Sequence, residues 1–206
     1  MRRFAVAIVV LLAALNPAAA QTPTPASTPT EQFRTYTDQI LKILQNSEFR
    51  DLDSPDKLHE AVRKTAIRMF GVGDAARQAL GPHWQARTAA ERDQFVELFA
   101  DLIEATYINQ LNRPGGVRLR YTGETIDGDR AEVALVVLTK RGSELKVGVR
   151  LRAQGPRWLI ADILIEGVSL IQTYRAQFDR VIKRGSYAEL VRQVRTKIDS
   201  LYRVKS

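Results

Sequence analysis

The residue types that carry most catalytic chemistry are scarce in this chain. Its 206 residues include two histidines, His59 and His83, and no cysteine. Without thiols there is no disulfide, no cysteine nucleophile and no zinc or iron–sulfur site with cysteine ligands. His83 precedes Trp84, a setting more typical of a packing or hydrogen-bonding residue than of a catalyst. His59 is predicted on the polar side of a helix, where it would be solvated.

One segment, Gly71-Val-Gly73-Asp-Ala-Ala76, matches the loose G-x-G-x-x-A pattern of dinucleotide-binding proteins. That fingerprint must follow a strand and open a helix. Here an amphipathic helix precedes it, so we predict a turn between two helices. Asp127 and Asp129 flank a glycine, and turn chemistry explains both carboxylates. The residues therefore predict no catalytic site and no metal site, and the chain is not expected to be an enzyme.

The N-terminus has the features of a secretory signal peptide. Two arginines precede an uncharged apolar run over residues 4–15, and alanines at 18–20 offer a cleavage site. The apolar run, about 12 residues, is shorter than the roughly 20 that span a bilayer. We predict a cleaved signal peptide over 1–20, a disordered Pro/Thr-rich linker over 21–30 and a single domain over 31–206. The mature chain is expected to be secreted and soluble.

Apolar residues recur at helical spacing before and after a central region. Thr88-Ala-Ala-Glu91 and Ser186-Tyr-Ala-Glu189 are capping boxes, which mark helix starts. The helix that begins at Thr88 carries a wide stripe that includes Phe95, Phe99 and Leu102. The predicted helices cover residues 31–45, 54–71, 74–80, 88–111, 170–185 and 186–201.

In the central region the apolar spacing changes to a period of two. Val147, Val149 and Leu151 alternate with polar residues, as expected of a half-buried strand. Turn residues separate the apolar runs at intervals of hairpin length. The pattern predicts a four-stranded antiparallel meander and, with the flanking helices, an α+β domain with helices on one sheet face. The first predicted strand starts near residue 117. The other three cover residues 130–139, 145–152 and 157–165.

The chain is basic, with a formal net charge of +8. Much of this charge lies in residues 166–206, which carry nine basic against four acidic residues. Secretion argues against nucleic acid as a partner of this segment. Anionic lipid surfaces and acidic protein faces remain as partners that such a charge would attract. The alternative is a solvated helix face without a partner.

The most specific run is Asp162-Ile-Leu-Ile-Glu166-Gly-Val-Ser-Leu170, followed by Tyr174-Arg-x-x-Phe178. This run resembles the MlaC-type (toluene-tolerance) periplasmic lipid-binding proteins. The similarity extends over about residues 30–203 and includes Trp84, Phe95, Phe99, the Thr106-Tyr107 pair and Gly185-Ser-Tyr187.

This resemblance implies a soluble periplasmic carrier that shuttles phospholipid and maintains outer-membrane lipid asymmetry. The implied partners are an outer-membrane lipoprotein–porin complex and an inner-membrane ABC transporter complex with its MCE-type receiving subunit. The implied fold is a curved NTF2- or cystatin-like sheet packed against helices that enclose an apolar cleft. The phospholipid would be cargo, and no cofactor is implied.

The apolar stripes of the long helix and the strands supply candidates for the cleft walls. Basic residues near the end of the helix over 170–185, namely Arg180, Lys183 and Arg184, are predicted to dock on partners. The residues predicted to surround the acyl chains are Phe95, Phe99, Leu102, Ile103, Val133, Leu135, Val147, Val149, Ile163, Tyr174 and Phe178.

Three other interpretations are open at this point. The chain could belong to a related branch that carries hopanoids. It could be a secreted enzyme with a cystatin-like or NTF2-like fold, for which only His83 and Asp162 are available as acid or base. It could also be a periplasmic adaptor without a cavity, in which the apolar stripes are filled core.

Overall fold

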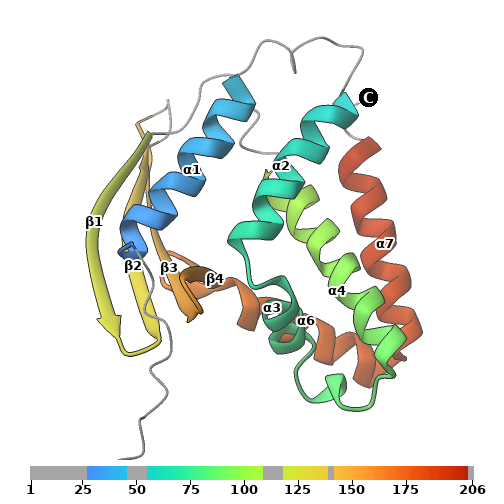
Figure 1. Ribbon diagram of the computed structural model, residues 1–206. Coiled ribbons are helices and arrows are strands. Elements are labelled where there is room, and N and C mark those ends of the chain that lie inside the picture. Colours follow the sequence, from blue (N-terminus) through green and yellow to red (C-terminus); the bar gives the residue numbers. More distant parts are fainter. Residues whose placement is uncertain (1–26, 46–54, 109–117, 139–141, 204–206) are drawn as a thin grey trace, which may run out of the picture.

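The computed structural model describes residues 27–45, 55–108, 118–138 and 142–203. The predicted signal peptide, much of the predicted linker and the end of the helix predicted over 88–111 lie outside these residues. Strands form a curved layer, one helix lies along it, and further helices stand beyond that helix (Figure 1). This is the predicted α+β class. Within the described part of the chain, no helix has the length and apolar character needed to cross a membrane.

The described chain alternates helical and extended segments in three blocks, namely helices, a sheet and helices. In chain order the elements are α1 (Pro29–Gln45), α2 (Pro55–Met69), α3 (Val72–Leu80), η2 (Gly81–Trp84), α4 (Ala89–Ile103), η3 (Glu104–Ile108), β1 (Arg118–Asp127), β2 (Arg130–Leu138), β3 (Glu144–Gln154), β4 (Arg157–Ile165), β5 (Val168–Ser169), α6 (Leu170–Arg184) and α7 (Tyr187–Arg203).

The sheet has five strands in the order β1-β2-β3-β4-β5, each antiparallel to its neighbours. The prediction of four strands is therefore wrong by one. The fifth strand has only two residues, which is too short to show an alternating pattern in the sequence. The chain reverses into it at Glu166 and Gly167, whose φ angles are 49° and 80°. Gly167 adopts this left-handed conformation without steric cost.

The capping box predicted at Thr88 is confirmed, and at Ser186 the Glu189 N–H donates to the Ser186 hydroxyl, which is one half of the box predicted there. Thr88 and Glu91 form a reciprocal capping box at the start of α4. Gly71 lies in the turn between α2 and α3, and its N–H donates to the Ile160 carbonyl of β4. The rest of the predicted turn segment, from Val72 to Ala76, lies inside α3, so that prediction holds for Gly71 alone. The start of α1, at Pro29, lies two residues inside the predicted linker.

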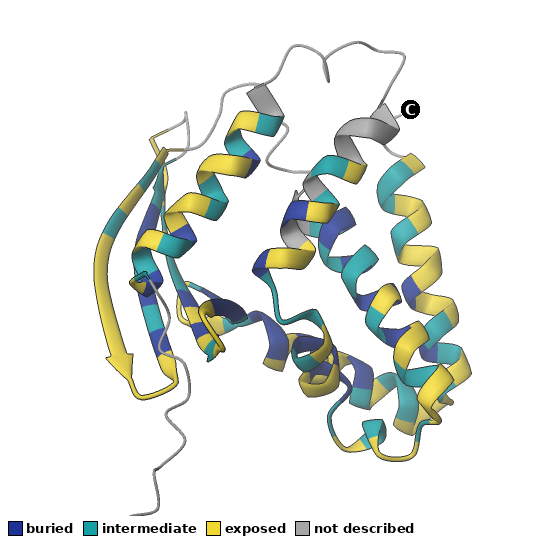
Figure 2. Ribbon diagram, in the orientation of Figure 1, coloured by how far each residue is buried: buried dark blue, intermediate teal, exposed yellow. Residues whose placement is uncertain are grey.

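Buried residues occur both on the strands and on the helices (Figure 2), and they form two apolar clusters. One cluster lies mainly on the sheet, with contributions from α1 and α2, and the other lies among the helices. We call the first the sheet cluster; its buried members are Phe33, Ile40, Met69, Ala131, Val133, Leu135, Val149, Leu151, Trp158 and Ile160. We call the second the helical cluster; its buried members are Ala75, Ala76, Ala79, Leu80, Phe95, Leu98, Phe99, Leu102, Leu170, Ile171, Tyr174, Phe178, Leu190 and Val194.

Asp162 connects the sheet to the helices. Its Oδ1 accepts hydrogen bonds from the backbone N–H of Ile163 (2.9 Å) and of Ile171 (3.1 Å). Its Oδ2 accepts a third hydrogen bond from the Ser169 hydroxyl (2.6 Å). Ile171 lies in the first turn of α6, so one β4 side chain fixes where that helix leaves the sheet. A carboxylate near a helix N-terminus is also favoured by the helix dipole.

Candidate functional site

The residues predicted to surround acyl chains are divided between the two clusters. Val133, Leu135 and Val149 are buried in the sheet cluster, and Val147 packs against it. Ile163, on β4, packs against both clusters. The remaining predicted residues belong to or pack against the helical cluster, namely Phe95, Phe99, Leu102, Ile103, Tyr174 and Phe178.

Aromatic rings fill the centre of the helical cluster. The Phe95 ring lies 5.8 Å from that of Phe178, measured between centroids, in an edge-to-face arrangement. Phe99 and Tyr174 make a similar contact at 5.5 Å. Phe95 has only 1% of its surface exposed. Such contacts stabilise a packed interior.

A small apolar cavity lies between the two clusters, where α2 faces α4. Phe99 and Ile103 of α4 line it, together with Ile67 of α2, Phe70 just after α2 and Val72 of α3. Phe70 packs against the sheet cluster, whereas the two α4 residues belong with the helical cluster. We call this region the α2–α4 seam. Its cavity has a volume of about 40 Å³.

Three apolar seam residues, Ile67, Phe70 and Val72, were not among the residues predicted to surround the acyl chains. Ile67 is 44% exposed, which is high for a large apolar side chain, although it borders an apolar cavity. The apolar residues at helical spacing that predicted this helix do not include Ile67. A large apolar residue outside the predicted buried face of the helix was the available sequence signal for a lining role. Val72 follows the Gly71 turn and carried no such signal.

A group of four charged residues lies at one end of the seam. Arg63 of α2 donates a hydrogen bond to Asp101 of α4 and another to Glu97 (3.1 Å). Its guanidinium also lies 3.6 Å from a carboxylate oxygen of Glu104. Arg63 and Glu104 both line the cavity. We call these four residues the Arg63 cluster.

Glu104 is the buried member of the Arg63 cluster, with 5% of its surface exposed. Burial raises the pKa of Glu104; Arg63 opposes this rise and Asp101 adds to it. Burial lowers the pKa of Arg63, but the hydrogen bond to Asp101 and the nearby carboxylates raise it above its ordinary value. Glu104 also begins the π-helical turn η3, a distortion that is frequent at functional sites.

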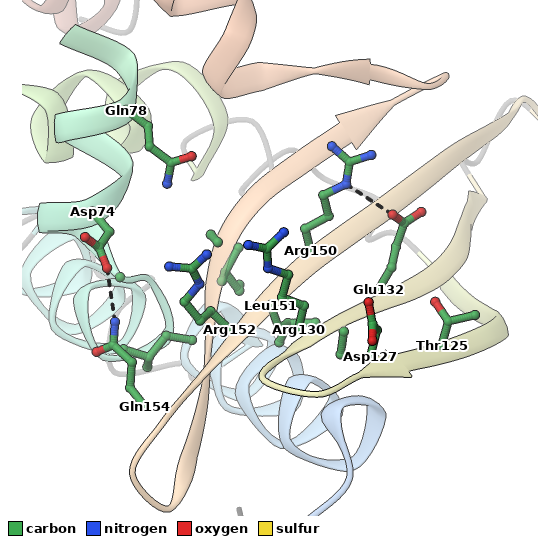
Figure 3. Close-up of a pocket in the computed structure, with 15 residues that line it drawn as sticks. Asp74, Gln78, Thr125, Asp127, Arg130, Glu132, Arg150, Leu151, Arg152 and Gln154 are labelled. Carbon is green, nitrogen blue, oxygen red and sulfur yellow. Dashed lines mark hydrogen bonds and ion pairs between the residues drawn. The ribbon is translucent and has the colours of Figure 1, made fainter. Parts of the chain in front are cut away.

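A larger hollow, of about 530 Å³, lies on the polar sheet face and is bordered by Asp74 of α3 (Figure 3). Arg150 and Arg152 of β3 point into it, since they alternate with the buried Val149 and Leu151. Most of its charges are paired, for example Arg150 with Glu132 at 3.1 Å and Arg152 with Asp129 at 3.8 Å. Paired, solvated charges of this kind explain the hollow without a ligand.

A third hollow, of about 280 Å³, lies between α6 and α7. It is bordered by three predicted residues, Leu102, Tyr174 and Phe178, and by polar residues that include Gln177 and Lys197. The predicted residues are thus not all brought to one place.

The two candidate acid or base groups are both engaged in structural contacts. Nε2 of His83 lies 2.9 Å from Oδ1 of Asp179 on α6, a hydrogen-bonding role as predicted. Asp162 accepts the three hydrogen bonds that connect β4 to α6. No group of three or more metal-ligating side chains occurs among the residues that the structure describes. The side chain of His59 lies outside them.

The three predicted docking residues lie in the last two turns of α6, and all are exposed. Lys183 pairs with Asp179 (2.8 Å). Hydrogen bonds from Lys183 and then His83 lower the pKa of Asp179. Arg180 and Arg184 share the same exposed helix end.

Comparisons with known proteins agree with the architecture. The family model described as MlaC protein matches residues 34–196. The structure resembles the phospholipid-binding protein from Ralstonia solanacearum, which was solved in complex with a phospholipid. That likeness has a TM-score of 0.75 and 23% sequence identity, and covers 85% of this chain and 99% of that one. A much weaker likeness, with a TM-score of 0.34 and 16% identity, relates 65% of this chain to 97% of an NTF2-like protein from Campylobacter jejuni.

Proposed function

The chain belongs to the MlaC protein family, and from this we propose that it is a periplasmic carrier of phospholipid. In this proposal it holds the acyl chains in an apolar cleft and shuttles the lipid between outer- and inner-membrane complexes. The Ralstonia solanacearum protein has the same fold and was solved with a bound phospholipid. This supports the proposal that phospholipid is the cargo of this chain.

The observation that carries the proposal is the division of the interior into two apolar clusters with a cavity between them. A filled single core would leave no such boundary. At about 0.8 kcal/mol per buried CH₂, a sixteen-carbon chain gains roughly 12 kcal/mol when it leaves water. Apolar walls on both sides of a cleft are what this transfer requires.

The cavity of about 40 Å³ holds on the order of one or two water molecules, so it is the beginning of a cleft and not a full one. In the proposal, an acyl chain enters as α2 separates from α4, and apolar side chains such as Ile67 and Ile103 then contact the lipid. Without lipid these side chains contact each other or solvent.

Native mass spectrometry of the exported chain, followed by solvent extraction, tests the carrier function. The expected result is a mass excess equal to one diacyl phospholipid or more, with the lipid recovered intact. A hopanoid-sized adduct would assign the chain to the related hopanoid branch. No adduct after incubation with phospholipid vesicles would contradict the carrier function and favour the adaptor.

We further propose that the exposed end of α6 docks on the membrane partners. Reversing the charge of Arg180, Lys183 and Arg184 to glutamate is expected to weaken association with those partners and leave bound lipid intact. A control of similar charge change is the pair Arg118→Glu and Arg120→Glu on β1, which are also exposed. Loss of lipid from the α6 variant would contradict this division of roles.

A further inference from the structure

β1 forms an open edge of the sheet. The strand order is β1-β2-β3-β4-β5, so β1 has a neighbouring strand on one side only. No described element lies along its other side (Figure 1), and no backbone group of β1 bonds to a described residue outside β2. Alternate residues of an antiparallel strand direct their N–H and C=O groups away from the neighbouring strand, so about half of these groups in β1 are free to pair with a further strand.

This edge lacks most of the features that keep sheet edges from pairing. Natural edge strands are often short, carry lysine or proline, or are covered by a helix or loop. β1 has ten residues, of which eight are exposed, and none of them is lysine or proline. Its one protective feature is a β-bulge at Thr122, where the register with β2 shifts. A long, exposed edge of this kind is a template for another strand.

The bulge determines which residues of β1 share a sheet face. Residues that lie opposite each other in an antiparallel pair have their side chains on the same face. Because Thr122 is an extra residue, the polar sheet face carries two residues before the bulge and two after it, namely Arg118, Arg120, Thr125 and Asp127. The inner face, which packs against α1, carries Leu119, Tyr121, Glu124 and Ile126.

The polar face of β1 carries opposite charges at its two ends. Arg118 begins the strand and Asp127 ends it, and both are exposed. Within the described part of the chain, neither side chain forms an ion pair, whereas Arg120 pairs with Glu144 (3.1 Å). A second copy of this strand that runs antiparallel to the first places its Asp127 opposite Arg118, and its Arg118 opposite Asp127. A parallel copy would place like charges side by side.

The faces of the strand are also complementary to those of an antiparallel copy. With a two-fold axis between Thr122 and Gly123, all ten residues have an opposite residue in the second copy, and each pair lies on one sheet face. The side-chain pairs are Arg118 with Asp127, Leu119 with Ile126, Arg120 with Thr125 and Tyr121 with Glu124. A shift by one residue would place Arg118 opposite Ile126, which is on the other face. In the matching register, Leu119 of the second copy covers Ile126, which is 54% exposed in the single chain.

We propose that two copies of this chain pair through β1 in the antiparallel direction, so that the sheet continues from one copy into the other. This inference does not depend on the proposed carrier function. α6 follows β5, at the opposite edge of the sheet, so the proposed docking end of α6 stays exposed in both copies. The interface is one strand edge, which is small, and the dissociation constant is expected to be on the order of micromolar.

Sedimentation velocity of the exported protein, from low to high micromolar concentration, tests the pairing. The expected result is a shift in mass from one chain to two as concentration rises. The measurement is made on lipid-loaded and on delipidated protein, which keeps it separate from the carrier function. A mass of one chain at every concentration would overturn the proposal, whether or not lipid is bound.

A charge exchange tests the opposition of Arg118 and Asp127. Arg118→Asp or Asp127→Arg alone places like charges opposite each other twice in each dimer, so each should raise the dissociation constant about tenfold. The double variant restores opposite charges and should return the dissociation constant to that of the unaltered protein. The matched controls are Arg157→Asp on β4 and Asp93→Arg on α4, both exposed, which should leave it unchanged. A double variant no tighter than the single ones would overturn the proposed register.

Cross-linking tests the register by a second route, because the chain has no cysteine of its own. The proposed register places Arg120 opposite Thr125 of the second copy, so the variant Arg120→Cys with Thr125→Cys should form a covalent dimer on mild oxidation. The two positions lie about 16 Å apart within one strand, which is too far for a disulfide inside one chain. Arg120→Cys alone is the control, since it has no cysteine opposite it. Equal cross-linking of the two variants would contradict the pairing through β1.

Discussion

The helical cluster and the sheet cluster bury apolar side chains in different ways. In the helical cluster, the rings of Phe95, Phe99, Tyr174 and Phe178 contact one another through edge-to-face and stacked pairs. The sheet cluster instead consists mainly of aliphatic residues in a row across the strands, such as Val133 opposite Val149. β1, at the sheet edge, is exposed along most of its length.

This difference distinguishes core residues from candidate lipid-lining residues, which the sequence alone could not tell apart. Phe95, which is enclosed by other rings and has 1% of its surface exposed, cannot contact a ligand unless its neighbours move, because protein interiors are close-packed. A residue at the boundary of a cluster, such as Ile103 or Ile163, can exchange a protein neighbour for a lipid. Substitutions at the cluster centres are therefore expected to lower the free energy of unfolding strongly. Substitutions at the seam are expected to change lipid binding instead.

The largest effect is expected from Phe95→Ala. Loss of this enclosed ring leaves a cavity, which should lower the free energy of unfolding by about 3–5 kcal/mol. The counterpart in the sheet cluster is Leu135→Ala, with an expected loss of about 2–3 kcal/mol because a smaller side chain is removed. Urea unfolding followed by circular dichroism measures both. A Phe95→Ala loss below 1 kcal/mol would show that the helical cluster is not a closed core.

A smaller loss is expected at the connection between the clusters. Asp162→Ala removes three hydrogen bonds and leaves the Ile171 N–H without this acceptor, which should reduce stability by about 2 kcal/mol. Asp129→Ala is the control, since Asp129 is exposed and its ion pairs are long. Its effect should stay within about 0.5 kcal/mol. Equal losses in the two variants would mean that Asp162 does not fix α6 to the sheet.

The seam is tested by two exposed isoleucines. Ile67→Ala removes a residue that lines the seam cavity, whereas Ile126→Ala removes one that does not. Neither change should alter stability by more than about 0.5 kcal/mol. Lipid retention should weaken by about 1 kcal/mol, or roughly fivefold, in the Ile67 variant alone. The rate of lipid transfer to acceptor vesicles measures this; identical rates would remove Ile67 from the proposed cleft.

The smallest effects concern pH, and they have opposite signs at two carboxylates. Burial raises the pKa of Glu104 above 4.5, so the folded protein binds more protons than the unfolded chain just above that pH. Glu104 therefore lowers stability as pH rises through its folded pKa, and Glu104→Gln should remove that decrease.

Asp179 behaves in the opposite way. Lys183 and His83 lower the pKa of Asp179 below 3.8, so its contribution is present above that pH and is lost as pH falls through the folded pKa. Asp179→Asn should remove this contribution. Melting temperatures of both variants and the unaltered protein, measured from acid to neutral pH, check the two signs. The same sign at both sites would contradict the burial of Glu104.

Local features of the fold could be predicted from sequence where a few neighbouring residues decide them. Residues close together in the chain determine three of these features: the capping box at Thr88, the turn at Gly71 and the strand with Val149. The start of α1 was missed although Thr28 and Glu31 bond reciprocally there. The two-residue strand β5 was missed because its pairing depends on the reversal at Gly167.

The sequence by itself determined the α+β class, the apolar faces and the resemblance to the MlaC family, since periodicity and motifs are properties of the chain order. Only the tertiary structure decided which apolar residues meet at the seam and which are enclosed. It also brought Arg63 of α2 to two carboxylates of α4 and to Glu104 at the start of η3. Periodicity tells which face of an element is buried, but the neighbour of that face depends on how distant elements pack. That packing decides which buried charge, such as Glu104, lies beside a charge of opposite sign.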